Sequence, residues 1–155
     1  MNNISCTRRL INEYKKIDKK TEYGISYYPN DKNINECHFI LSCEHSPYAG
    51  GEYYGIITIP HNYPHGTPSF KMLTPSGRFE IGKLICPELE GHPALTLFKY
   101  LIWLQSIMYE ESNTIGSLNI SLAERQQLAI ASHDFNERNY KDWKEIKNKF
   151  EIQKE

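Results

Sequence analysis

A run of short segments rich in aromatic and β-branched residues, between about residues 21 and 73, constrains the fold of this chain more than any other feature. Turn signals at Pro29-Asn30-Asp31 and Ala49-Gly50-Gly51 interrupt the run, and consecutive strands with short turns favour an antiparallel meander. Residues 60–68 contain three prolines and a glycine, which predicts an irregular surface loop. Four strands are therefore predicted, over residues 23–28, 36–42, 53–59 and 69–73.

Helical patterns lie on both sides of the predicted sheet. Leu10, Ile11, Tyr14 and Ile17 recur at helical spacing and predict a helix over about residues 5–18, with Ser5 as its cap. Beyond a long non-repetitive segment over residues 74–92, three further stripes predict helices. Their members are Leu97, Leu101, Leu104 and Met108, then Leu128, Ser132 and Phe135, then Trp143, Ile146 and Phe150.

Ser121 and Glu124 form a capping-box signature that marks the start of the second of these helices. The 155 residues contain no repeat and no long linker, and this length suits one domain. We therefore expect a single α+β domain over residues 1–155, with a core over about residues 5–150. Its parts are an N-terminal helix, a four-stranded antiparallel meander, a long irregular segment that carries the candidate site, and C-terminal helices.

Charge and hydropathy argue against several classes of protein. The formal net charge is −1, whereas nucleic-acid-binding domains are usually basic. No apolar stretch approaches the ~20 residues that cross a bilayer, so we expect no membrane segment in this chain; an anchor removed from beyond residue 155 would leave the same sequence. Residues 7–20 are rich in lysine and arginine, and form either a solvated helix face or a docking face for an acidic partner.

Cysteine is the residue type in this sequence that most strongly suggests a reactive side chain. No secretory signal precedes the cysteines, so the expected compartment is reducing and the thiols are expected to be free. Cys86 lies in the irregular segment, and functional residues are often held on such segments by a rigid scaffold. A lone cysteine is nevertheless more often a small buried hydrophobe than a nucleophile. The other three cysteines are Cys6, Cys37 and Cys43.

Metal binding is not expected from the histidine and cysteine spacing. The cysteines and histidines over residues 37–45 match no zinc pattern. His61 and His65 are four residues apart, but Pro64 between them prevents a shared regular helical face. The sequence also lacks a glycine-rich phosphate loop and a Gly-x-Ser-x-Gly elbow.

Three short motifs and a strand follow one another along the first half of the chain. They read Arg9-Leu10-Ile11-Asn12-Glu13, Ser46-Pro47-Tyr48-Ala49-Gly50-Gly51, Tyr53-Tyr54-Gly55-Ile56-Ile57-Thr58-Ile59-Pro60 and Tyr63-Pro64-His65-Gly66-Thr67-Pro68. In this order they resemble the Arg-Ile-x-x-Glu helix start, the Ser-Pro-Tyr-x-Gly-Gly turn, the third strand and the Tyr-Pro-Phe-Lys-Pro-Pro loop of the ubiquitin-conjugating enzymes.

The second half of the chain resembles the J class, a divergent, tail-anchored branch of that family in the endoplasmic reticulum. Thr74-Pro75-Ser76-Gly77-Arg78-Phe79, followed by Leu84-Ile85-Cys86, is similar to the branch's Thr-Pro-Asn-Gly-Arg-Phe and then Leu-Cys. Residues 113–118 and 125–129 resemble two later motifs of the branch. The resemblance covers about residues 5–150 and implies the fold and the activity of the family.

This resemblance implies roles for three residues of the irregular segment. Cys86 matches the cysteine that accepts the C-terminus of ubiquitin as a thioester from an activating enzyme. Ser76 falls where the family places an asparagine that stabilises the oxyanion or holds the nearby loop, and a plain turn serine is the alternative. Glu88 stands where many members have an aspartate that orients the acceptor, and a solvated glutamate is the alternative.

The resemblance also implies partners. In the family the first helix and two loops bind the ligase, and the matching residues are Arg9, His65, Pro93 and Ala94. His65 replaces a large apolar anchor, so an unusual RING-type ligase is expected; the alternative is that these are only exposed loop residues. Ubiquitin and the activating enzyme are the other expected partners. We expect no cofactor, because the activating enzyme uses the ATP, and a monomer in the cytoplasm or on the cytosolic face of the endoplasmic reticulum.

Three alternatives stay open from the sequence. The chain could be a non-catalytic adaptor of the same fold, a conjugating enzyme for another ubiquitin-like modifier, or an unrelated thiol enzyme. Cys86 argues against the adaptor, whereas Ser76, His65 and the short segment over residues 87–95 keep it open. An unrelated thiol enzyme needs a base beside Cys86, and His92 is the candidate.

Overall fold

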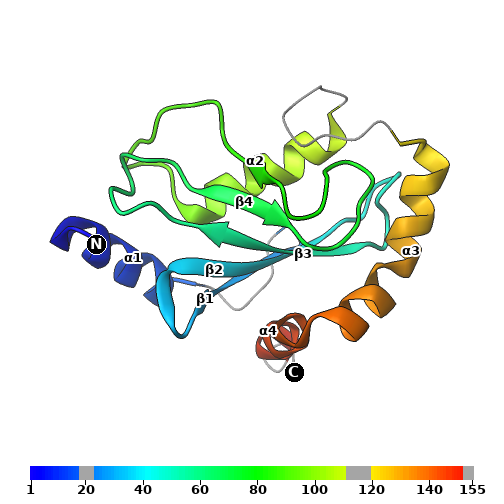
Figure 1. Ribbon diagram of the computed structural model, residues 1–155, viewed down its shortest axis with the longest axis horizontal. Coiled ribbons are helices and arrows are strands. Elements are labelled where there is room, and N and C mark those ends of the chain that lie inside the picture. The colour runs from blue at the N-terminus through cyan, green and yellow to red at the C-terminus, as the bar shows by residue number, and fades with distance from the viewer. Residues whose placement is uncertain (18–22, 111–119, 152–155) are drawn as a thin grey trace.

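One antiparallel sheet runs through the molecule, with helices on both of its faces (Figure 1). The structure, a computed structural model, describes residues 1–17, 23–110 and 120–151. The α+β class and the order of parts predicted from the sequence are confirmed. The elements in these ranges are α1 (Ile4–Lys15), β1 (Ile25–Asn30), β2 (Asn33–Ser42), β3 (Glu52–Thr58), β4 (Ser69–Met72), β5 (Leu84–Ile85), α2 (Leu97–Tyr109), α3 (Leu122–Asn139) and α4 (Lys141–Glu151).

The sheet has the order β1-β2-β3-β4-β5, and every neighbouring pair is antiparallel. The four predicted strands are present, and residues 60–68 form no helix or strand, as expected. A fifth strand, β5, was not predicted, because two residues are too few to show an alternating pattern. Its residues pair with β4 through Phe70↔Ile85 and Lys71↔Leu84. The irregular segment is thereby anchored to the sheet directly before Cys86.

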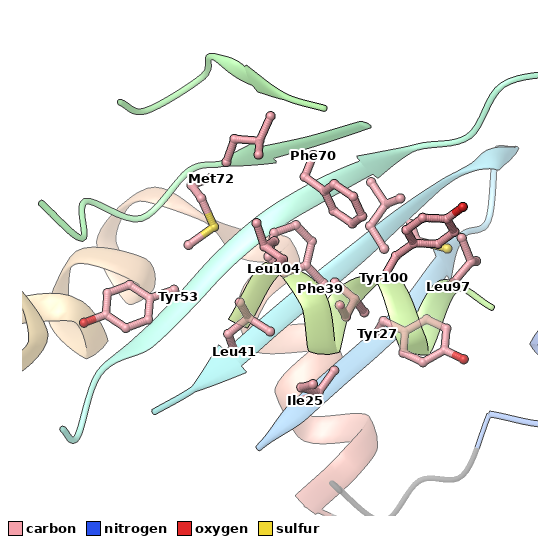
Figure 2. Close-up of a cluster of buried hydrophobic side chains, with 14 of the residues drawn as sticks. Ile25, Tyr27, Phe39, Leu41, Tyr53, Phe70, Met72, Leu97, Tyr100 and Leu104 are labelled. Carbon is pink, nitrogen blue, oxygen red and sulfur yellow. The ribbon is translucent and has the colours of Figure 1, made fainter. Parts of the chain in front are cut away.

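Helix α2 packs on the inner face of the sheet and closes the main core. Its predicted stripe is confirmed, since all four of its members are buried. Figure 2 shows side chains of β1 to β4 gathered against those of α2. The labelled examples are Ile25, Tyr27, Phe39, Leu41, Tyr53, Phe70 and Met72 from the strands, with Leu97, Tyr100 and Leu104 from α2.

Helix α4 packs on the other face of the sheet. Trp143 and Ile146, which the sequence places on one helical stripe, form a second buried cluster with Ile40 of β2 and Tyr54 of β3. The side chain of Phe150, the third member of the stripe, lies outside what the structure describes. No helix in the described ranges is long and apolar enough to cross a membrane.

Helix α3 meets the sheet through polar contacts as well as apolar ones. The backbone N–H of Glu52 donates to Ser132 Oγ (2.9 Å), and Asn136 Nδ2 donates to the Glu52 carbonyl (2.8 Å). Thr74 Oγ1 donates to Asn136 Oδ1 and accepts from the Tyr54 N–H (2.8 Å). Ser132, Asn136 and Thr74 are buried, so these contacts satisfy groups that would otherwise be costly to bury. Because they hold the start of the 74–92 segment, they help to place the candidate site.

The helix caps test two expectations from the sequence. Ser121 caps α3 as predicted, accepting from the Glu124 N–H (3.2 Å). The cap of α1 is Asn3 rather than Ser5, because Asn3 Oδ1 accepts from the Cys6 N–H (2.7 Å) and the helix begins at Ile4. Asparagine is as good a cap as serine, so local preference alone does not choose between the two positions.

Candidate active site

Cys86 directly follows the last strand of the sheet. The preceding residue, Ile85, pairs with Phe70 and is only 3% exposed. The following residue, Pro87, is also buried, whereas Cys86 between them is exposed. Two buried neighbours therefore hold the backbone on both sides of an accessible thiol, which is the arrangement that a covalent carrier requires.

The other three cysteines have buried side chains, and all four are free thiols, as predicted. Burial raises the pKa of the Cys37 thiol to about 12 and the pKa of the Cys43 thiol to about 11. Burial also raises the pKa of Cys6. Because the thiolate is the nucleophile, these three residues are inert near neutral pH. Cys86 is thus the one cysteine of the chain that a large partner can reach.

No histidine lies in hydrogen-bond contact with Cys86 within the described residues. His92, the candidate base, is engaged elsewhere, since its Nδ1 accepts from the Ala94 N–H (3.0 Å). A Cys–His pair of the kind used by thiol hydrolases therefore does not form in the described part of the chain. This observation argues against the unrelated thiol enzyme.

Ser76 is completely buried and is engaged in its own turn. Its Oγ accepts hydrogen bonds from the backbone N–H groups of Arg78 (3.1 Å) and Phe79 (3.4 Å). Gly77, which lies between Ser76 and Arg78, has φ +78°, a conformation that favours glycine. The serine hydroxyl thus holds the loop over residues 74–79, one of the two roles that the resemblance implies for this position.

Arg78 links the same loop to the end of α2. Its side chain is 2% exposed, and its Nε donates to the carbonyls of Ile107 and Glu110, at 3.1 Å each. The guanidinium also lies over the Phe79 ring, 4.6 Å from the centroid. A cation at the C-terminal end of a helix is favourable, because that end carries partial negative charge. The sequence motif contained Arg78 but gave no signal for this contact.

The acidic candidates are placed less specifically. Glu88 is exposed, two residues beyond Cys86, and no hydrogen bond joins Glu88 or Ser76 to Cys86 in the described ranges. Glu110, an acidic residue of the loop after α2, is exposed and ends that helix. Its neighbours Glu111, Ser112 and Asn113 lie outside the described residues, as does the motif over residues 113–118.

Arg9, Pro93 and Ala94 are brought together by the fold. Arg9 Nη1 donates to the Pro93 carbonyl (2.6 Å) and Arg9 Nη2 donates to the Leu95 carbonyl (3.0 Å). Most of the Arg9 guanidinium is therefore used inside the protein. Pro93 and Ala94 are exposed, so they remain accessible to a partner.

His65 lies close to these residues because the backbone of its loop approaches Gly91. A Cβ added at Gly91 would lie 2.0 Å from the His65 carbonyl oxygen and 2.4 Å from that of Pro64. The loop over residues 60–68 and the segment over residues 87–95 can thus touch only because residue 91 has no side chain. His65 itself is exposed. We refer to the four residues Arg9, His65, Pro93 and Ala94 as the loop face.

A buried carboxylate beneath the loop face was missed by the sequence analysis. Glu13 is 8% exposed and accepts from Arg9 Nε (2.7 Å), from the Tyr63 hydroxyl (2.5 Å) and from the Leu97 N–H (2.9 Å). Burial and the hydrogen bond to Glu13 raise the pKa of Tyr63. The i, i+4 spacing of Arg9 and Glu13 was the available signal for an ion pair. No pattern in the sequence indicated the contacts to Tyr63 and Leu97.

Comparisons with known proteins identify a family and several relatives of this chain. A family model described as ubiquitin-conjugating enzyme matches residues 9–145. The ubiquitin-conjugating enzyme E2 J2-like protein of Dictyostelium discoideum is 37% identical over 141 residues, which are 86% of this chain and 83% of that protein. Ubiquitin-conjugating enzyme E2 J2 of Homo sapiens is 34% identical over 139 residues, which are 85% of this chain and 54% of that protein.

The structural comparison gives the same fold. A crystal structure from Plasmodium yoelii, of a protein assigned to the ubiquitin conjugating enzymes, matches with a TM-score of 0.63 and 23% identity, and the match covers 92% of this chain and 95% of that one. The chain spans little more than half the length of most of the curated relatives it matches. Relatives that carry the J2 name confirm the resemblance to that branch. The chain belongs to the ubiquitin-conjugating enzyme family.

Proposed function

We propose that this chain is a ubiquitin-conjugating enzyme that carries ubiquitin as a thioester on Cys86. The observation that supports this most is the contrast among the four thiols. Cys86 is exposed between two buried residues at the end of β5, whereas Cys6, Cys37 and Cys43 are buried and burial raises the pKa of each. Cys86 is therefore the thiol that a partner can reach, whereas burial makes the other three poor nucleophiles.

The chemistry is two acyl transfers. In the first, the Cys86 thiolate attacks the carbonyl carbon of the ubiquitin thioester on the activating enzyme, a new C–S bond forms, and the cysteine thiolate of the activating enzyme leaves. In the second, an acceptor amine attacks the same carbonyl carbon, the Cys86 thiolate leaves, and the amine loses a proton. No electron is transferred, so neither step requires a redox cofactor.

Ser76 and Glu88 have supporting roles in this proposal. Because the Ser76 hydroxyl is buried and accepts from two backbone N–H groups, we assign it to holding the 74–79 loop rather than to the oxyanion. Glu88 is exposed close to Cys86 in sequence, where a carboxylate can orient an incoming amine and take up its proton.

The loop face is the proposed docking surface for the activating enzyme and for a RING-type ligase. Arg9 contributes mainly by fixing Pro93 and Leu95, and the exposed residues His65, Pro93 and Ala94 make the contact. We further propose that the protein works as a monomer in the cytoplasm, or on the cytosolic face of the endoplasmic reticulum in endoplasmic-reticulum-associated degradation. Nucleic acid has no part in the proposal.

An adaptor of the same fold is the second candidate, and one observation favours it. The Ser76 hydroxyl is hydrogen-bonded within its own loop, so the oxyanion position lacks the amide that the family places there. Such a protein would be charged slowly or would not discharge. A conjugating enzyme for a different ubiquitin-like modifier would share every feature of the Cys86 site.

A charging assay tests the proposal. The chain is mixed with ubiquitin-activating enzyme, ATP and ubiquitin, and the products are separated on a non-reducing gel. We expect an adduct of one ubiquitin mass that reductant removes. It should be absent in Cys86→Ala and present in Cys6→Ser, a matched control at a buried thiol whose Sγ faces the Pro60 carbonyl. No adduct in the wild type would move the assignment to the adaptor or to another modifier.

A further inference from the structure

The turn over residues 92–95 has donors around all of its carbonyl groups. Within the turn, the Leu95 N–H donates to the His92 carbonyl (2.9 Å). The other three carbonyls accept from cationic side chains of two helices, Arg9 of α1 and Lys99 of α2. These bonds run from Arg9 Nη1 to Pro93 O (2.6 Å), from Lys99 Nζ to Ala94 O (2.9 Å) and from Arg9 Nη2 to Leu95 O (3.0 Å).

A second backbone N–H of the turn, that of Ala94, donates to a histidine ring. Its acceptor is His92 Nδ1, at 3.0 Å. A backbone N–H can only donate, so this hydrogen bond requires a lone pair on Nδ1, as in the neutral ring that carries its proton on Nε2. Pro93 has no N–H. The His92 ring thus provides the acceptor for the Ala94 N–H.

Protonation of His92 would remove that acceptor. The Nδ1 atom would become a donor facing the Ala94 N–H, in a turn that already faces the cations of Arg9 and Lys99. Histidine is the side chain that changes charge between about pH 5 and 8. The other titratable groups around the turn are Glu13, which neutralises Arg9, His65 of the loop packed on Gly91, and Glu88 and Glu90 of the same segment.

We propose that neutral His92 is a positioning residue of the loop face. It acts through the Ala94 N–H, holding Pro93 and Ala94 in the conformation that partners bind, and it releases them when it is protonated. The effect on partners rests on the proposed function, whereas the hydrogen bond and its loss do not. Partner binding by this chain should therefore weaken as the pH falls below neutrality.

Two substitutions separate the hydrogen bond from other effects of the ring. In His92→Asn, the Oδ1 atom can accept from the N–H two residues further on, as in an Asx turn, and it does not titrate in this range. In His92→Ala, no acceptor is present at any pH. The wild type should therefore resemble the asparagine variant at high pH and the alanine variant at low pH.

Amide hydrogen exchange at Ala94, measured by NMR from pH 5.5 to 7.5, tests the hydrogen bond itself. At pH 7.5 the wild type and His92→Asn should exchange about three- to tenfold more slowly than His92→Ala, the range expected for one exposed hydrogen bond. At pH 5.5 the wild type should match His92→Ala, while His92→Asn keeps its protection. A ratio of wild type to His92→Asn that stays constant over the range would overturn the proposal.

The consequence for partners is measured with ubiquitin-activating enzyme as the probe. The KM for this chain in thioester formation is compared between wild type and His92→Asn at the same pH, so that the pH dependence of the activating enzyme cancels. The ratio of wild type to His92→Asn should be near one at pH 7.5 and rise about three- to tenfold at pH 6.0, with the kcat ratio unchanged. A ratio near one at both pH values would overturn the role in partner binding. If no variant is charged, the proposed function fails, and the exchange data still decide the role of His92.

Discussion

The Glu13 carboxylate accepts a hydrogen bond from the Leu97 N–H, 2.9 Å away and 84 residues further along the chain. Leu97 is the first residue of α2, so the carboxylate sits where that helix has unsatisfied N–H groups and partial positive charge. The same carboxylate pairs with Arg9 and accepts from Tyr63. One buried residue therefore joins α1, the 60–68 loop and the start of α2, the elements that surround the loop face.

Replacing Glu13 should destabilise the protein strongly. Glu13→Ala removes the acceptor of the Leu97 N–H and of Arg9 Nε, and leaves the Tyr63 hydroxyl only the longer contact to the Leu95 carbonyl (3.3 Å). We expect a loss of about 2–4 kcal/mol, because one partner of a mostly buried pair is removed. Urea denaturation gives the value. Glu80→Ala is the matched control, since Glu80 pairs with Lys83 on the surface (2.7 Å) and such pairs contribute little. Equal losses in the two variants would contradict the account.

Gly91→Ala should separate the two loops that meet at this residue. Its Cβ would lie 2.0 Å from the His65 carbonyl oxygen, so the backbone must move and we expect a loss of about 1–3 kcal/mol together with a higher KM for thioester formation. Gly82→Ala provides the comparison. Gly82 has open space around it but φ +77°, so its substitution should cost about 1–2 kcal/mol of strain and leave KM unchanged. Unchanged KM in Gly91→Ala would show that the loops do not form a shared docking surface.

Ser76→Ala distinguishes a loop role from an oxyanion role. Losing the hydroxyl removes the acceptor of two buried N–H groups, and we expect a loss of stability of about 1–3 kcal/mol. The rate of thioester discharge to free lysine, measured in single turnover below the melting temperature, should fall less than about tenfold. A fall of about 10²–10³ would instead assign Ser76 to the oxyanion.

Stability should decrease at alkaline pH because of the buried thiols. An unfolded cysteine has a pKa of about 8.5, whereas the native pKa is about 11 for Cys43 and about 12 for Cys37. The native state retains protons that the unfolded state releases, so this contribution is complete below about pH 8.5 and is lost as the pH rises towards 11 to 12. The urea midpoint should fall between pH 8 and pH 10, and it should fall less in the Cys37→Ala, Cys43→Ala double variant. An identical fall in both proteins would contradict this assignment.

The sequence predicted the elements better than the contacts between them. The strands, the buried stripe of α2 and the cap at Ser121 follow from periodicity and local preference, and all are confirmed. The two-residue strand β5 carries no period, and its pairing with Phe70 depends on where β4 lies. The partners of Glu13 at Tyr63 and Leu97 are equally non-local.

For the candidate site too, the motifs indicated which residues lie together but not the contacts that each side chain makes. The exposure of Cys86 and the grouping of Arg9 with Pro93 agree with what the motifs imply. The burial of Ser76 was not readable from its sequence, because a turn serine can face either solvent or its own backbone. The engagement of Arg9 with carbonyl groups inside the protein also could not be read from its motif, since an arginine on a helix face can point to solvent equally well.

The most direct test of the account is to locate the acyl group on the charged protein. After charging, the adduct is digested briefly with trypsin near neutral pH without any thiol, and the peptides are identified by mass spectrometry. Cleavage after Lys83 and Lys99 yields a peptide over residues 84–99, in which Cys86 is the only cysteine. The account predicts that the C-terminal fragment of ubiquitin is attached to this peptide and that an added thiol such as dithiothreitol releases it by exchange at the thioester carbonyl. Attachment to the peptide that contains Cys6, or to the one that contains Cys37 and Cys43, would contradict the assignment of Cys86 as the carrier.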